Sequence, residues 1–106
     1  MPKYLIEASY TPEGLKGLQK DKASGRRTAV ASAAETLGGK LEATYYTFGD
    51  EDVIAILDLP DNVAASALSL AVSASGLVRT KTTPLLTVEE TDKALAKSVN
   101  YRAPGR

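Results

Sequence analysis

The fold is decided by the run Val53-Ile54-Ala55-Ile56-Leu57. Five consecutive apolar residues, most of them branched, are typical of a β-strand that is buried on both faces. Such a strand lies inside a sheet, and each of its faces needs a cover. A chain of 106 residues has only one layer of helices available, so another subunit is the simplest cover for the second face.

The neighbouring segments complete a four-stranded pattern. A second β-rich run at Leu41–Phe48 is joined to the first through Gly49–Asp52, which predicts a hairpin. Two further strands are predicted at Tyr4–Tyr10 and Leu77–Thr83. The sequence therefore predicts four strands, of which the second and third are adjacent along the chain.

Helices are predicted between these strands. The first begins with Thr11 as N-cap and Pro12 at the first helical position. Polar residues around Gly25 predict a break within it, and Gly38 ends it as a left-handed C-cap. The second helix begins after Asp61 as N-cap, presents an alanine-rich apolar stripe and ends before Gly76.

A short C-terminal helix completes the pattern. Thr87–Glu90 is a capping box that opens this helix, which we expect to continue to about Val99. The predicted elements before this C-terminal helix follow the order β-α-β-β-α-β. This order predicts an α+β fold of the ferredoxin-like kind, which is a four-stranded antiparallel sheet with both long helices on one face. Alternation directs Tyr4, Ile6 and Ala8 towards the helices. The residues that it directs towards a partner sheet are Leu5, Leu77, and Ile54 or its neighbours.

Composition excludes several classes of chemistry. The chain has no Cys and no His, so disulfides, thiolate nucleophiles, histidine bases and the usual zinc sites are excluded. Its formal net charge of +0 gives no general attraction to nucleic acid or anionic membrane. It has neither a signal-peptide pattern nor a long apolar run, so we expect a cytoplasmic protein without a cofactor.

A family resemblance rests on three segments: Leu37–Leu41, Tyr45–Ile56 and Leu77–Thr82. Together they resemble the GYD domain family, and the likeness extends from the first strand to about residue 92. The resemblance implies a domain over residues 1–92, followed by the rest of the C-terminal helix and a flexible tail over residues 93–106. It also implies an assembly like that of dimeric α+β barrels, and it implies fold and assembly more than activity.

The chain departs from the family at the motif for which the family is named. The matching place keeps Gly49 and Asp52 but has Glu51 where the tyrosine of the Gly-Tyr-Asp run would stand. If that tyrosine contacts a ligand in relatives, Tyr45 or Tyr46 would have to replace it here.

Candidate site residues lie on the face predicted to point away from the helices. We expect Glu7, Tyr46 and Arg79 to line a pocket between packed sheets, with the Arg79 guanidinium holding an anionic or carbonyl-bearing molecule. The structural alternative is that Glu7 and Arg79 form an ion pair that only fixes the register of the interface.

Two other charged clusters have simpler interpretations. Asp50 and Asp52 could hold Mg²⁺, but we favour a turn in which Asp52 accepts hydrogen bonds from backbone N–H groups of the hairpin, and we expect no metal site. The basic cluster on the first helix lacks aromatic residues for base stacking, so we expect a solvated helix face and no nucleic-acid binding. It consists of Lys16, Lys20, Lys22, Arg26 and Arg27.

Two functions remain open at this point. The first is a non-enzymatic homodimer or higher homo-oligomer that assembles through its open sheet face and binds a small ligand. The alternative is a cofactor-free enzyme of the dimeric α+β barrel type, acting on a small carbonyl or phenolic compound in a pocket between sheet and helices. In that enzyme Arg79 would stabilise negative charge, and Glu7 or Asp52 would handle a proton.

Overall fold

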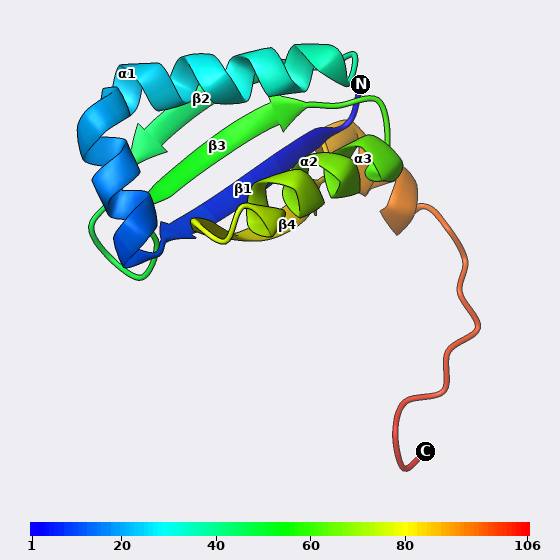
Figure 1. Ribbon diagram of the computed structural model, residues 1–106. Coiled ribbons are helices and arrows are strands. Elements are labelled where there is room, and N and C mark those ends of the chain that lie inside the picture. The colour runs from blue at the N-terminus through cyan, green and yellow to red at the C-terminus, as the bar shows by residue number, and fades with distance from the viewer.

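The computed structural model describes residues 1–106 and contains a four-stranded antiparallel sheet with three helices. The elements are β1 (Lys3–Tyr10), α1 (Pro12–Thr36), β2 (Lys40–Tyr46), β3 (Val53–Asp58), α2 (Asn62–Ala74), β4 (Val78–Leu85) and α3 (Val88–Leu95). The strand order is β2-β3-β1-β4, and α1 and α2 cover the same face of the sheet (Figure 1). The predicted α+β, ferredoxin-like fold is therefore confirmed.

The helix boundaries follow from local capping. Thr11 Oγ1 accepts a hydrogen bond from the Gly14 backbone N–H at 3.2 Å, and Asp61 Oδ1 accepts one from the Ala64 N–H at 2.9 Å. The predicted break in α1 lies at Lys22, whose φ of 67° is left-handed, and Gly38 at φ 80° follows the end of this helix. These predictions are confirmed.

Two predicted ends are wrong. The strand expected to reach Phe48 ends at Tyr46, because the hairpin closes early through a 2.8 Å hydrogen bond from the Thr47 N–H to the Asp52 carbonyl. The C-terminal helix ends at Leu95 rather than near Val99. Ser, Val and Asn are weak helix formers, and nothing packs on residues 96–100 to offset their low propensity.

The hydrophobic core lies at one end of the sheet, where β1 begins and β3 ends. Tyr4, Leu57 and Leu59 are completely or almost completely buried there, and Tyr4 donates a 2.7 Å hydrogen bond to Asn62 Oδ1 at the start of α2. Ile6 and Ala8 also face the helices. The predicted orientation of β1 is confirmed.

The other face of the sheet carries no helix from α1 or α2, and we call it the open face. Strand register places Leu5 between Ile56 and Thr83 on this face, and it places Ile54 opposite Glu7. The expectation for Leu77 was wrong. Residue pairing in β4 begins only at Val78, and Leu77 lies in the preceding turn, where its carbonyl accepts a 3.0 Å hydrogen bond from Thr11 N–H.

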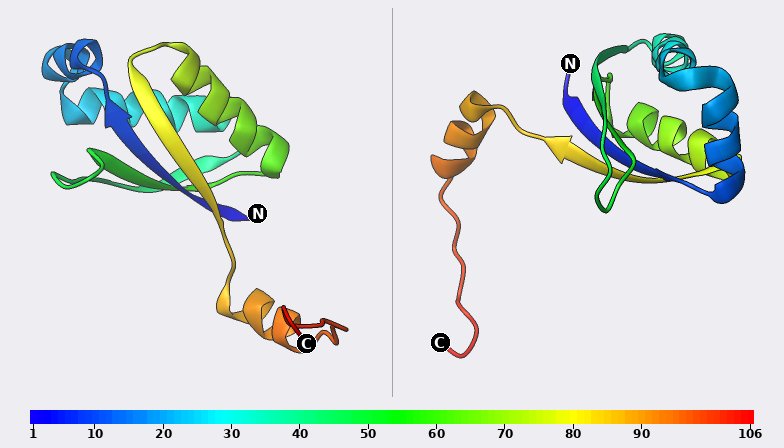
Figure 2. Two further views of the ribbon diagram at one scale, coloured as in Figure 1. Left: turned by 90° about the horizontal axis from the view of Figure 1, so that it is seen from below. Right: turned by 90° about the vertical axis from the view of Figure 1, so that its left-hand side faces the viewer.

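The C-terminal part of the chain projects from this body. Figure 2 shows α3 and residues 96–106 extending away from the sheet in both views. The radius of gyration is 16.8 Å, whereas a compact domain of this length has about 13 Å. None of the helices combines the length and the hydrophobicity needed to cross a membrane.

Candidate functional site

A cleft lies between the two helices above the middle of the sheet. The helices diverge because α1 packs chiefly against β2 at one edge and α2 packs against β4 at the other. Two adjoining cavities occupy the space between them, an inner one of about 70 Å³ on the sheet and an outer one of about 310 Å³. The residues that line both are Tyr10, Arg26, Leu68, Val72 and Val78. We call this space the inter-helix cleft.

The inner cavity is mostly apolar because 11 of its 16 lining residues are hydrophobic. Its floor includes Ala8 of β1 and Ala55 of β3, and its walls include Val30 of α1 and Leu68 of α2. Methyl side chains on the two central strands are too short to reach the diverging helices. The cavity therefore results from small residues in the places where a closed core would have large ones.

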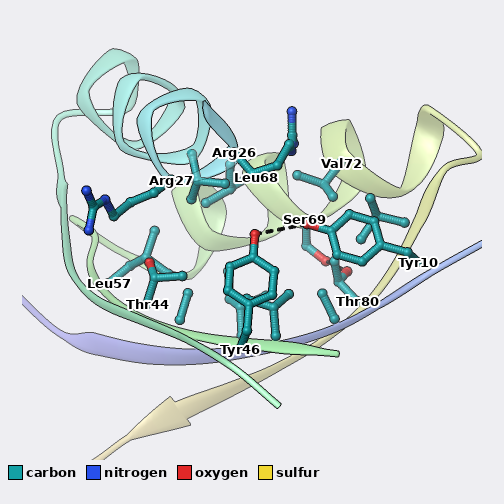
Figure 3. Close-up of a pocket in the computed structure, with 16 residues that line it drawn as sticks. Tyr10, Arg26, Arg27, Thr44, Tyr46, Leu57, Leu68, Ser69, Val72 and Thr80 are labelled. Atoms are coloured by element: carbon teal, nitrogen blue, oxygen red, sulfur yellow. Dashed lines mark hydrogen bonds between the residues drawn. The ribbon is translucent and has the colours of Figure 1, made fainter. Parts of the chain in front are cut away.

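Two tyrosine hydroxyls meet at this cavity. Figure 3 shows the Tyr46 and Tyr10 rings with their hydroxyl oxygens facing each other, at a distance of 3.4 Å. Burial, followed by the hydrogen bond with Tyr10, raises the pKa of the Tyr46 phenol well above its ordinary value. Tyr46 is therefore a neutral hydrogen-bonding group at physiological pH and not a base.

A third polar group in the wall has no partner. Thr44 Oγ1 is fully buried, lines the inner cavity and makes no hydrogen bond. An unpaired buried hydroxyl costs roughly 1–3 kcal/mol. By contrast, the Ser69 and Thr80 hydroxyls in the same wall lie 2.8 Å apart and satisfy each other. Thr44 therefore has an unused hydrogen-bonding position at the cavity.

The charged groups of the inner cavity are both cationic. Arg26 and Arg27 come from α1 just after its kink, and Figure 3 shows their side chains directed outwards at the rim. Arg26 lies 3.7 Å from the Asp21 carboxylate, whereas Arg27 has no ion pair. No Asp or Glu lines the inner cavity. Asp21 lines the outer cavity, so it is the inner cavity whose electrostatics favour a guest that accepts hydrogen bonds or carries negative charge.

The structure does not bring the predicted site residues together. Tyr46 pairs with Val53 and faces the helices, whereas Glu7 and Arg79 lie on the open face, so the three do not line one pocket. The cause is a β-bulge between Leu41 and Ala43, which inserts one residue and exchanges the two faces of β2 beyond it. Simple alternation from Leu41 would have placed Tyr46 on the open face.

The remaining predicted residues have separate environments. Glu7 lies opposite Lys81 and Arg79 opposite Ser9, and neither Glu7 nor Arg79 has an ion-pair partner within 4.0 Å. Asp52 Oδ2 accepts a 2.8 Å hydrogen bond from the Tyr10 backbone N–H. Asp52 therefore accepts from a backbone N–H as predicted, but the predicted donor is wrong because this N–H belongs to β1 and not to the hairpin. No cluster of three or more potential metal-ligating carboxylates is present.

Sequence reasoning missed most of the cleft. No sequence pattern marks Tyr10 or Thr44 as a site residue, and the pattern around Arg26 and Arg27 predicts a solvated helix face. One signal was available. Ala8 and Ala55 are small residues in strands that face alanine-rich helices, and this combination leaves unfilled volume when the helices do not approach closely.

Among known protein families, the family model described as GYD domain matches residues 4–95, from β1 to the end of α3. No curated protein and no solved structure matches the chain.

Proposed function

This chain belongs to the GYD domain family, and on that premise we propose that it is a homodimer that binds a small molecule in each inter-helix cleft. The observation that carries the proposal is the unpartnered Thr44 hydroxyl in the wall of an otherwise apolar cavity. Buried polar groups are normally hydrogen-bonded, so an unpaired one requires an explanation, and for Thr44 we propose a ligand that supplies the partner. Thr82 Oγ1 is also buried without a partner, but it lies outside the lining of the cavity.

The lining defines the ligand class. The body of the ligand is flat and apolar, because it fits between alanine and branched side chains. One end carries a carbonyl or an anionic group, which accepts from the Thr44 and Tyr46 hydroxyls and is attracted by Arg26. The inner cavity lined by Thr44 and Tyr46 holds only about 70 Å³, and the adjoining outer cavity of about 310 Å³ reaches the lower end of the range of roughly 300–1,000 Å³ for small-molecule sites. The ligand is therefore small and extends from the inner cavity into the outer one.

Exposed surface supports the dimer. The chain exposes 7,599 Å², whereas a compact monomer of 11.2 kDa exposes about 5,700 Å². The projecting residues 86–106 account for part of this excess, so the surface for a standard interface of about 800 Å² on each partner comes from the open face together with this segment. The open face offers Leu5, Ile54 and Ile56 as the apolar centre of that interface. The unpaired charges of Glu7 and Arg79 would then find partners across the dimer.

The geometry favours binding over catalysis. The enzyme alternative needs a group that transfers a proton inside the cleft. Glu7 faces the opposite side of the sheet, and Asp52 is engaged with the Tyr10 N–H outside the lining. The raised pKa of Tyr46 keeps its phenol protonated. The groups left in the inner cavity bind and orient a guest.

The test uses benzoate as a probe, because it combines a flat ring with a carboxylate. We expect millimolar benzoate to shift amide NMR signals around Thr44 and Leu68. The Ala55→Leu substitution, which fills the inner cavity, should abolish these shifts and stabilise the fold by about 1 kcal/mol. Thr44→Val, which keeps the shape but removes the hydroxyl, should weaken binding about fivefold to tenfold.

Two controls make the test specific. Ala67→Leu adds the same volume at an exposed position of α2 and should leave benzoate binding unchanged. Benzylamine, which replaces the anionic end with a cationic one, should not bind in the cleft. Benzoate shifts that persist in the Ala55→Leu variant, or the absence of shifts around the cleft, would contradict the proposed site.

A further inference from the structure

Residues 86–101 form an arm that makes little contact with the rest of its own chain. Every residue of this segment is exposed, and α3 has no substantial packing against α1, α2 or the sheet. Val88 and Leu95 lie seven residues apart on one face of α3 and are 74% and 77% exposed. The other large apolar residues exposed on this C-terminal arm are Leu86, Val99 and Tyr101.

The helix in the arm has a defined start. Thr87 and Glu90 form both hydrogen bonds of a capping box, each at 3.0 Å. A helix of eight residues is nevertheless marginal in water unless its apolar face packs against something. The family match ends at residue 95, so this helix belongs to the family domain and is not an appended tail. Its packing partner is missing from the single chain.

We propose that the C-terminal arm packs against a second copy of this chain in the homodimer, an inference that rests on the dimer proposed above. Both views of Figure 2 place α3 on the side of the sheet opposite to α1 and α2. A partner sheet stacked on the open face would lie about 10 Å from it. The partner sheet and α3 would therefore lie on the same side of the sheet. The arm and the open face are therefore parts of one continuous surface.

Charge complementarity supports a second copy of the chain as the partner of the arm. Glu89, Glu90 and Asp92 make α3 acidic, whereas Arg79 and Lys81 on β4 are cations without an ion pair. A second copy offers both apolar surface and cations to the arm.

The first experiment compares dimer dissociation constants by analytical ultracentrifugation of the full chain. The Val88→Gln/Leu95→Gln double variant keeps good helix propensity but loses the apolar face. We expect its dissociation constant to rise about tenfold or more, because two exposed apolar side chains would be buried in the dimer. The matched Lys93→Gln/Lys97→Gln variant changes the arm outside this apolar face and should change the constant less than twofold.

The second experiment reports on the location of the arm. The chain contains no Trp, so Leu95→Trp introduces a single tryptophan, which can be excited selectively over the five tyrosines. Its emission should lie at short wavelength in the dimer and move to longer wavelength on dilution, whereas Lys93→Trp should resemble an exposed residue throughout. A buried emission that is independent of concentration means that the arm folds onto its own chain, which overturns the inference.

The outcomes separate the two proposals. A dimer whose dissociation constant is unchanged by the Val88→Gln/Leu95→Gln substitutions overturns the arm inference and leaves the dimer intact. A wild-type chain that is monomeric at all concentrations overturns the dimer and the arm inference together.

Discussion

Replacing Ile56 with lysine is expected to convert the homodimer that we propose into a monomer, with a dissociation constant raised at least about 1,000-fold. Ile56 lies at the centre of the open face, opposite Leu5 of β1 and Ala43 of β2. Two-fold symmetry places the substitution in the interface twice. An unpaired buried charge costs roughly 3–5 kcal/mol, and a tenfold change in affinity corresponds to about 1.4 kcal/mol.

Sedimentation velocity measures this change directly. The control is Leu70→Lys, which places the same charge at an exposed position of α2 on the helical side. We expect this variant to remain dimeric. A dimer that survives Ile56→Lys with wild-type affinity would mean that the open face is not the interface.

Replacing Leu57 with alanine is expected to lower the free energy of unfolding by about 3 kcal/mol. Leu57 is adjacent to Ile56 but faces the helices, where it is completely buried in the core with Tyr4 and Leu59. The loss is a large part of the roughly 5–15 kcal/mol that stabilises a typical domain. Urea unfolding at a fixed protein concentration measures it, because dimer stability depends on concentration.

The control for this prediction is Leu70→Ala, which truncates an exposed leucine and should change the free energy of unfolding by less than about 0.5 kcal/mol. Adjacent residues of β3 would then show two different phenotypes: Ile56 would govern assembly and Leu57 the stability of the fold. A loss below about 1 kcal/mol for Leu57→Ala would contradict the assigned core.

The sequence predicted the fold well because its signals are local. Thr11, Asp61 and Thr87 cap helices through their own neighbouring backbone groups, and Gly38 adopts a left-handed conformation that favours glycine. The run from Val53 to Leu57 identified a strand with two apolar faces. Each of these features depends on a few consecutive residues, so a single sequence reveals it.

The cleft could not be predicted in the same way. Its position depends on the divergence of α1 and α2, which is a property of packing between segments far apart in the sequence. The placement of Tyr46 depends on one bulge between Leu41 and Ala43, and no residue type in that segment marks the bulge. One inserted residue moved the predicted site residue to the other face of the sheet.

The arm illustrates a third case. Its capping box was recognised, but the sequence cannot show that the helix leaves the body of its own chain. The polarity pattern of Val88 and Leu95 is the same whether the apolar face meets its own sheet or another copy. Only the arrangement in space separates the two possibilities.

Native mass spectrometry of the purified full chain tests the central claim that the open face is an interface between two copies. We expect a dimer with twice the 11.2 kDa mass of the chain at micromolar concentration, and we expect the Ile56→Lys variant to lose it. A spectrum of the wild-type protein that contains only the 11.2 kDa monomer would contradict this interface.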